Sequence, residues 1–215
     1  MASDPDLATQ ISRQLRTVRF GRPLQVYPLV TSTNDLARDL AASGAGEGTA
    51  VLALEQSAGR GRLGRRWASP PGGLYLSLVL RPDLRMERWP LIGLACSLGA
   101  AAAAEAHAGA PVRVKWPNDL LLDGRKVGGI LIEVAGDAAV CGIGVNLLHG
   151  GPAERGTAAP PSALLPEEAT WLAARSPDVS VAALVPDLLL ECERRYDRLR
   201  DDPAIVLAEW RGRAL

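Results

Sequence analysis

The chain has 215 residues, of which 47% are hydrophobic and 22% charged, a composition typical of a folded globular protein that excludes an intrinsically disordered one. Lysine plus arginine and aspartate plus glutamate each number 24, so the formal net charge is zero. The basic excess typical of a dedicated nucleic-acid-binding protein is therefore missing. A chain of this length can bury one substantial core, so we expect a single domain.

The cysteines and histidines argue against several kinds of site. His107 and His149 are isolated from each other and from the cysteines, which disfavours a histidine-centred triad or a zinc site. The first residues lack the apolar core of a signal peptide, and the most apolar stretch, 91–104, is too short to span a bilayer. We therefore expect a cytoplasmic protein without a membrane partner. Reduced, buried thiols are expected at Cys96, Cys141 and Cys192.

The hydrophobic pattern of the first half predicts strands separated by helices. Residues 31–34 offer side chains that can cap a helix ending at Gly44. Residues 55–73 lack apolar periodicity and are rich in Gly, Arg and Pro, which predicts a long loop with a functional role or disorder. In chain order we expect a helix at 7–16, a strand at 24–30, the helix ending at Gly44, strands at 49–54 and 74–80, and a helix at 88–108.

The second half begins with strands and ends with helices. An Asp123-Gly124 pair between apolar runs predicts a hairpin with a type I′ turn. Strands followed by helices indicate an α+β fold, in which a mixed, mostly antiparallel sheet is covered by helices. We expect strands at 112–116, 120–122, 126–134 and 138–146, a Gly/Pro-rich linker at 148–161, and helices near 162–175, 180–200 and 203–212.

An arginine- and glycine-rich segment, residues 59–67, lies inside the long loop and is called the Arg–Gly loop below. It holds four arginines, whose guanidinium groups match phosphate oxygens, and glycines that let the backbone approach a ligand. Its Gly59-x-Gly61-x-x-Gly64 pattern fits the dinucleotide fingerprint, but residues 67–73 contain two prolines and cannot form the required helix. A solvated loop without a role and a contact with RNA backbone are the alternatives.

Residues 115–119, Lys-Trp-Pro-Asn-Asp, end a predicted strand in a rigid turn. Lys115 at a strand end suits a carboxylate or an α-phosphate, and Asp119 could accept a proton or orient an incoming amine. The alternative interpretation is structural, with Trp116 in the core and ordinary turn chemistry after it.

Adjacent glycines interrupt the strand that begins at Lys126. Gly128 and Gly129 weaken the strand unless something must lie flat against its backbone, and a small ring-shaped ligand meets that condition. Residues 142–144 repeat the glycine pattern on a strand that ends at Asn146, whose amide suits a base or a ribose. A bulge or tight packing would explain either glycine pair.

Together and in this order, the motifs resemble those of the biotin–protein ligase family, in the form of a monofunctional catalytic domain. The resemblance covers residues 26–147 and implies the biotin ligase catalytic fold, which is similar to that of class II aminoacyl-tRNA synthetases. The segments that carry it are Ser32-Thr33-Asn34, Glu55-Gln56, the Arg–Gly loop, and residues 115–119, 126–130 and 142–146.

The resemblance implies three sets of site residues. In the first set, polar side chains hydrogen-bond the ureido ring of biotin and the glycines let the ring lie against the sheet. The implied biotin-binding residues are Ser32, Thr33, Asn34, Gln56, Gly59, Arg60, Arg62, Lys126, Gly128 and Gly129. The implied ATP- or adenylate-binding residues are Arg62, Arg65, Trp67, Lys115, Asn118 and Asn146. The implied catalytic residues are Lys115, Arg60, Lys126 and Asp119.

The resemblance also implies an ATP-dependent, AMP-forming reaction. The biotin carboxylate attacks the α-phosphorus of ATP, and a lysine of a biotin carboxyl carrier protein of acyl-CoA carboxylases then attacks the acyl carbon. Lysines, arginines and Mg²⁺ stabilise the developing charge, and the Mg²⁺ is expected through the ATP phosphates because no side-chain cluster suggests a metal site. Asp119 helps to position or deprotonate the acceptor lysine.

Some members of this family carry an N-terminal winged helix-turn-helix and many continue into a small C-terminal SH3-like domain. The residues before 24 are too few for the first, and the chain ends near where the second would begin. We therefore expect one catalytic domain over residues 1–215, without operator DNA binding, and the resemblance leaves a homodimer open.

Two other functions compete with this interpretation. A lipoate or octanoate protein ligase or transferase uses similar acyl chemistry, but the Arg–Gly loop together with residues 115–119 argues against it. A non-catalytic RNA-binding module is disfavoured by the zero net charge and by an aromatic content of 4%, which provides few stacking platforms.

Overall fold

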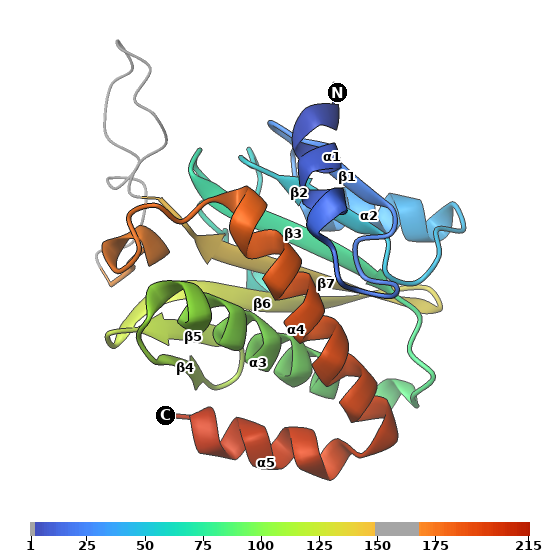
Figure 1. Cartoon of the computed structure of the whole chain (residues 1–215). Helices are drawn as coiled ribbons and strands as arrows, with labels where there is room; N and C mark the ends of the chain where they lie inside the picture. The colour runs from blue at the N-terminus through green and yellow to red at the C-terminus, as the bar shows by residue number, and fades with distance from the viewer. Residues whose placement is uncertain (1–2, 149–167) are drawn as a thin grey trace.

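A seven-stranded sheet forms the centre of the protein, shown in Figure 1 as a computed structural model that describes residues 3–148 and 168–215. The strand order is β1-β2-β3-β7-β6-β5-β4, and among these strands the β1–β2 pair is parallel while every other pair is antiparallel. The predicted mixed, mostly antiparallel sheet is confirmed. The strands are β1 (Leu24–Tyr27), β2 (Ala50–Ala53), β3 (Gly73–Leu80), β4 (Val112–Lys115), β5 (Asp119–Leu122), β6 (Arg125–Ala135) and β7 (Ala138–Asn146).

Helices cover the two faces of the sheet unequally (Figure 1). The larger core lies between one face and α1, α3 and α4, whereas α2 packs on the other face against β2, β3 and β7 around a small second core. The helices are α1 (Pro5–Gln14), α2 (Thr33–Ala42), α3 (Pro90–Ala108), α4 (Val181–Asp201) and α5 (Pro203–Arg213), with 3₁₀ turns η1 (Arg62–Gly64), η2 (Met86–Arg88) and η4 (Leu172–Ala174).

Strand β3 shows how the sequence distinguishes the two faces. Its leucines at 74, 76, 78 and 80 enter the larger core, and the alternate residues Tyr75, Ser77 and Val79 point to the α2 face. All eight residues of β3 are buried. A strand buried on both sides therefore carries apolar residues on one face and a mixture of polar and apolar residues on the other.

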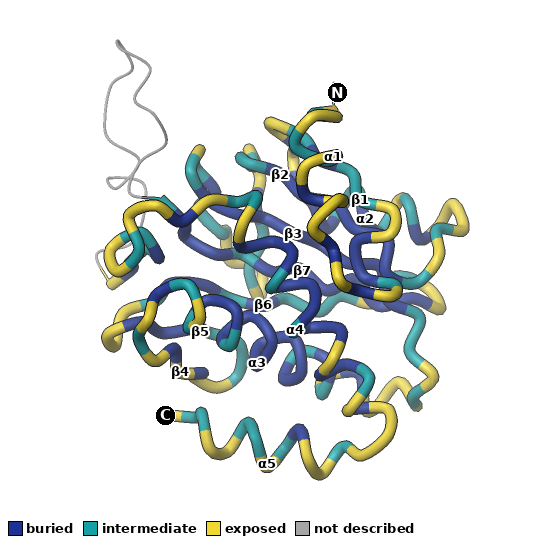
Figure 2. Tube along the Cα trace, in the orientation of Figure 1, coloured by how far each residue is buried: buried dark blue, intermediate teal, exposed yellow. Residues whose placement is uncertain are grey.

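Helix α3 is buried along much of its length, as its dark blue trace in Figure 2 shows. The stretch Met86–Ala108 is long and apolar enough to cross a membrane by length and composition, yet 67% of its most apolar window is buried, as in a core helix. Small residues let α4 approach closely. A Cβ atom at Gly99 would lie 2.7 Å from the backbone nitrogen of Cys192 in α4.

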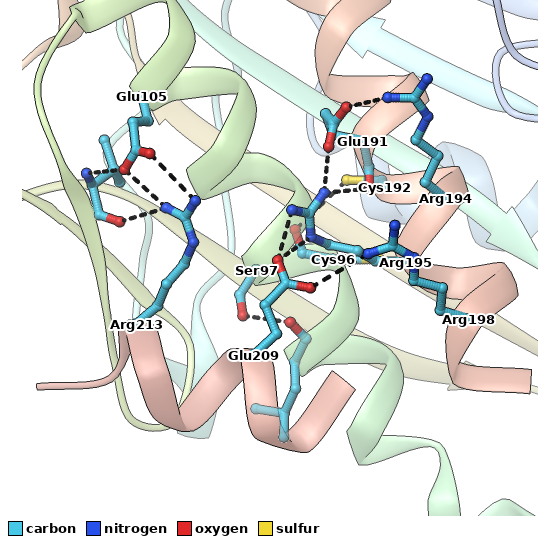
Figure 3. A network of polar contacts seen from close by, with 12 residues as sticks. Cys96, Ser97, Glu105, Glu191, Cys192, Arg194, Arg195, Arg198, Glu209 and Arg213 are labelled. Carbon is cyan, nitrogen blue, oxygen red and sulfur yellow. Dashed lines mark hydrogen bonds and ion pairs between the residues drawn. The ribbon is translucent and has the colours of Figure 1, made fainter. Parts of the chain in front are cut away.

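Ion pairs fix α5 against α3 and α4 (Figure 3). The guanidinium of Arg195 is 9% exposed as a side chain and contacts Glu209 of α5 at 2.7 Å as well as Glu191 of its own helix. Burial raises the pKa of Glu191, but the hydrogen bonds and charges of Arg195 and Arg194 together lower it by more, so it lies below its usual value. At the far end of α5, Arg213 pairs with Glu105 of α3 at 2.9 Å.

Most predicted elements are confirmed with shifted ends. The type I′ turn is confirmed, because Asp123 and Gly124 both have positive φ values, 52° and 74°. The strand predicted at 24–30 ends at Tyr27, and Val30 forms a single bridge with Gln56. The helix predicted near 162–175 is wrong over 168–175, where η4 is the helical turn; its earlier part, and the predicted linker after residue 148, lie outside the described residues.

The contact of Gly99 with α4 predicts a stability defect in Gly99→Ala. The added methyl would meet backbone atoms that cannot rotate away, so we expect a loss of about 1–3 kcal/mol in the free energy of unfolding. Gly93→Ala is the control in the same helix, because its Cβ would meet the flexible side chain of Ile132 at 3.3 Å. Both substitutions gain about 1 kcal/mol of helix propensity, so the difference between them reports the steric contact at Gly99. Urea unfolding compares the two, and equal midpoints would contradict the packing argument.

Candidate active site

A cavity of about 380 Å³ lies on the α2 face of the sheet, between the start of α2, the Arg–Gly loop and strands β6 and β7. A larger and more open cavity of about 1030 Å³ adjoins it. Six residues line both cavities: Gln56, Arg65, Arg66, Trp67, Asp119 and Lys126. The motifs quoted from the sequence are therefore brought together at one place.

The start of α2 forms the polar end of the first cavity. Ser32 is the N-cap residue, but its side chain makes no capping hydrogen bond and lines the cavity while only 1% exposed. The amide of Thr33 instead donates to Oε1 of Gln56 at 2.8 Å, and Gln56 Nε2 donates to Ser69 Oγ at 2.8 Å. The prediction that side chains of residues 31–34 cap this helix is wrong, because the loop supplies the acceptor.

Hydrogen bonds continue from Thr33 along the sheet as a polar line whose middle three members are buried, the residues Gln56, Thr33, Ser77, Asn34 and Glu133. Ser77 Oγ lies 2.8 Å from Thr33 Oγ1 and 2.6 Å from Asn34 Oδ1. Asn34 Nδ2 donates to Glu133 Oε2 at 2.6 Å. Both polar ends of the Asn34 amide are thus used by the protein, so this residue orients its neighbours.

Glycines on β6 and β7 form a flat floor under the indole of Trp67. A Cβ atom at Gly144 would lie 2.8 Å from the ring, and one at Gly129 would lie 3.4 Å from it. Gly128 does not face this cavity, contrary to its implied role in ligand binding, because successive residues of a strand point to opposite faces. A Cβ atom there would meet Leu120 on the other face at 3.1 Å, and Gly129 alone of this pair lines the cavity.

Backbone hydrogen bonds fold the Arg–Gly loop into a narrow hairpin. Gly61 donates to the carbonyl of Arg65 at 2.7 Å, and Trp67 donates to the carbonyl of Gly59 at 2.9 Å. A Cβ atom at Gly59 would lie 2.5 Å from the Trp67 carbonyl, so this glycine is required by the loop itself. At the tip, Leu63 has a φ of 57° and is 89% exposed, an uncommon conformation for a leucine.

Arg60 is held by carboxylates. Its Nη1 lies 2.7 Å from Asp35 Oδ1, and its Nη2 lies 2.8 Å from Glu133 Oε2. Its Nε is buried without a hydrogen-bond partner among the described residues. These carboxylates neutralise the charge of Arg60, but its side chain also lines the first cavity, so its implied roles as a catalytic group and as a contact to a ligand ring stay predictions.

The remaining loop arginines are exposed at the rim of the cavities. Arg62 Nη1 lies 3.5 Å from Asn118 Oδ1, at the limit of a hydrogen bond, across the mouth of the first cavity. Arg65 and Arg66 line both cavities. These three side chains are available to anionic oxygens of a ligand, as the sequence predicts for Arg62 and Arg65.

Lys126, Asp119 and Trp67 form the wall between the two cavities. Lys126 Nζ lies 2.6 Å from Asp119 Oδ1 and 5.1 Å from the centre of the Trp67 ring, a cation–π contact. Lys115 is exposed and lines the second cavity. The indole nitrogen of Trp67 is buried and has no partner among the described residues.

Three other predicted residues have structural partners. Trp116 is 64% exposed and meets Trp210 edge to face at 5.7 Å, so the interpretation that placed it in the core is wrong. Asn118 Nδ2 donates to the Ile130 carbonyl at 2.8 Å, which fixes the turn to β6. Asn146 lines the second cavity, but its Nδ2 donates to a backbone carbonyl, that of Thr170, at 3.0 Å.

Sequence reasoning missed several side chains that shape the site. Glu133 follows Gly129 and Leu131 at intervals of two residues on β6, so strand periodicity could have placed it on the same face. Asp35 carries no such signal, because its pairing with Arg60 joins a helix to a distant loop. The 3–148 and 168–215 segments contain no group of three or more His, Cys, Asp or Glu side chains that could hold a metal ion.

Comparison with known proteins is consistent with this geometry. The model of the biotin/lipoate A/B protein ligase family matches residues 26–146. The chain is 34% identical over 205 residues to the biotin–[acetyl-CoA-carboxylase] ligase of Mycobacterium tuberculosis, covering 90% of this chain and 71% of that protein. It is 38% identical over 145 residues to the bifunctional ligase/repressor BirA of Bacillus spizizenii, covering 65% and 45%. The chain spans about half the length of the first curated relatives it matches.

Two solved structures share the fold. The biotin protein ligase of Aquifex aeolicus in complex with biotin and ATP has a TM-score of 0.69 and 29% identity, with 83% of this chain and 72% of that chain covered. The biotin protein ligase of Leishmania major in complex with biotinyl-5-AMP has a TM-score of 0.68 and 30% identity, with 89% and 81% covered.

The flat glycine floor predicts that Gly144→Ala displaces Trp67. The new methyl would overlap the ring, so we expect the Trp67 contribution to the fluorescence emission to shift to longer wavelength as the indole enters solvent. That contribution is obtained by subtracting the spectrum of the matching Trp67→Phe protein. Gly46→Ala is the control, because nothing lies within 4 Å of a Cβ atom there. An unchanged Trp67 contribution in Gly144→Ala would contradict the described contact.

Proposed function

The chain belongs to the biotin/lipoate A/B protein ligase family, and on this premise we propose that it is a biotin–protein ligase. It forms biotinyl-5′-adenylate and pyrophosphate from biotin and ATP, then transfers the biotinyl group to a lysine of a carrier protein. One observation carries the proposal: a polar end, a flat glycine floor and a cationic rim belong to the same cavity. The solved structures with biotin, ATP or biotinyl-5-AMP support it.

The first cavity binds biotin in this proposal. A ureido group offers two N–H donors and one carbonyl acceptor, and the start of α2 offers matching hydroxyl and amide groups from Ser32, Thr33 and Gln56. Thr33 and Gln56 already bond each other, so a ureido group would meet their remaining hydrogen-bonding capacity and the hydroxyl of Ser32, which makes no capping bond. The glycine floor admits the flat indole of Trp67, which lines this cavity and offers a planar surface to a bicyclic ring.

The second cavity binds the nucleotide, together with the wall that it shares with the first cavity. Arg65, Arg66 and Lys115 give this cavity three cationic side chains, and Lys126 lies at its border with the first. Positive groups held in place before the reaction stabilise charge that develops on phosphoryl oxygens. The described residues offer no carboxylate cluster for Mg²⁺, so Mg²⁺ would be carried by the phosphates of ATP and would neutralise negative charge there.

The first half-reaction forms a bond between a biotin carboxylate oxygen and the α-phosphorus, and breaks the bond from that phosphorus to the oxygen bridging to the β-phosphate. The wall places Lys126 between the two cavities, at the border where these atoms meet. Its ammonium and that of Lys115 attract the substrates and stabilise the transition state without forming a covalent bond. Closing the loop arginines over the site excludes water, which protects the mixed anhydride.

In the second half-reaction the acceptor amine attacks the acyl carbon and AMP leaves. Asp119 is bound to Lys126 through Oδ1. The Oδ2 atom of Asp119 therefore remains to accept a hydrogen bond from the incoming amine and to orient it. We propose a biotin carboxyl carrier protein of an acyl-CoA carboxylase as acceptor, and we propose that residues 1–215 by themselves do not bind operator DNA. Sequence-selective duplex binding in a mobility-shift assay would contradict the last point.

Exchange of labelled pyrophosphate into ATP tests the first half-reaction. We expect exchange that depends on biotin and Mg²⁺, because only a reversible adenylation returns the label to ATP. Lipoate and octanoate are the matched alternatives within the same family. Exchange driven by either of them but not by biotin would replace the proposal by a lipoate or octanoate ligase function.

Lys115→Ala tests the division between binding and chemistry. The variant should bind biotin with unchanged affinity in calorimetry, because Lys115 lines the second cavity, and should lose roughly 10²–10³-fold in exchange rate. Arg113→Ala is the control, since Arg113 is the other exposed basic residue of β4. Exchange at the wild-type rate in Lys115→Ala would contradict a role at the phosphoryl centre.

A further inference from the structure

Glu133 lies on β6 where the strand leaves the cavity, on the face that also carries Gly129 and Leu131. Its side chain is 28% exposed and does not line either cavity. A partly buried carboxylate on this face needs partners, because removing a charge from water without a compensating contact is costly. The partners it has come from two segments that are distant in the sequence.

One oxygen of Glu133 holds both segments. Its Oε2 accepts hydrogen bonds from Asn34 Nδ2 at 2.6 Å and from Arg60 Nη2 at 2.8 Å. Arg60 also contacts Asp35, and Arg38 contacts Asp35 at 2.9 Å and Glu133 at 3.8 Å. Two arginines thus face two carboxylates, and the local charge is balanced.

The contact with Arg60 fixes the Arg–Gly loop. Arg60 pairs through its backbone with Arg66 on the other arm of the hairpin, so holding its side chain holds both arms. The guanidinium has its two terminal nitrogens on carboxylates, and charge-assisted hydrogen bonds of this kind are about twice as strong as neutral ones. The side chain of Arg60 therefore attaches the loop to the sheet and to α2.

The contact with Asn34 fixes the polar end of the first cavity. Asn34 is oriented by Glu133 on its nitrogen and by Ser77 on its oxygen, and Ser77 in turn contacts Thr33. The polar line therefore runs from Glu133 to the groups proposed to read the ureido ring. A change at Glu133 reaches the ligand through these residues, although Glu133 itself does not line the cavity.

We infer that Glu133 is a positioning residue for the substrate site, holding the Arg–Gly loop and the start of α2 in one arrangement through a single carboxylate oxygen. The inference rests on the proposed function only for the identity of the ligand, biotin. Arg60 acts through the placement of the loop, and the charge that meets the phosphates comes from the other loop arginines.

The first test needs no substrate. Glu133→Gln keeps the size of the side chain and removes its charge, and Asp137→Asn is the matched control, because Asp137 pairs with Arg81 at 2.7 Å but is 84% exposed at the far end of the β6–β7 hairpin. Limited trypsin digestion should cut after the loop arginines roughly tenfold faster in Glu133→Gln than in the control or the wild type. Arg60→Met removes this ion pair and the one with Asp35 from the loop side, and should give at least the same increase at the remaining arginines.

The second test measures biotin. Glu133→Gln should weaken biotin binding roughly tenfold in calorimetry, while the exchange rate at saturating biotin stays within about twofold of wild type. In the double variant with Arg60→Met the two losses of biotin affinity should be less than additive, because the two residues share one contact. A purely structural residue would instead lower the melting temperature and leave the affinity of the folded fraction unchanged.

The outcomes separate the inference from the proposed function. If the wild type does not bind biotin, the proposed function fails, and the digestion still decides whether Glu133 anchors the loop. If Glu133→Gln and Arg60→Met both show wild-type digestion, the inference is overturned. Wild-type biotin affinity in Glu133→Gln would also overturn it, even if the loop is cut faster.

Discussion

Polar side chains that are buried on the face of a sheet must find partners within the protein, and this constraint organises the α2 face. Ser77 and Asn34 are almost fully buried, and each is satisfied by the next residue along the polar line. Because the line ends on the charged pair of Glu133 and Arg60, the polar end of the cavity and the Arg–Gly loop share one set of bonds. Neither can move without breaking a contact of the other.

The opposite face of the sheet supplies the stability that the polar α2 face does not. The leucines of β3 and the close approach of α3 and α4 build a large apolar core there. The α2 face is thus free to carry glycines and polar residues that contribute little hydrophobic stabilisation. One face holds the fold together and the other carries the site, which is why the chemistry-bearing motifs gather on a single side of the sheet.

The sequence was sufficient for the strands, the Asp123-Gly124 turn and the collection of motifs at one site, because these depend on local pattern and on residue type. It was insufficient where a contact joins distant segments. Gly128 faces away from the cavity, which the alternation of residues along β6 predicts, whereas the carboxylates that neutralise Arg60 come from two distant segments, α2 and β6. The capping of α2 by Gln56 is a long-range contact of the same kind.

Retention of the activated intermediate tests the central claim most directly, since the account requires one site that binds biotin, joins it to the nucleotide and shields the product. The protein is incubated with biotin and MgATP, passed rapidly through a desalting column and examined by native mass spectrometry. The account predicts a mass increase of one biotinyl-adenylate per chain, which is lost when a carrier protein with an acceptor lysine is added. Separate retention of biotin or ATP without the adenylate, or no retained mass at all, would contradict it.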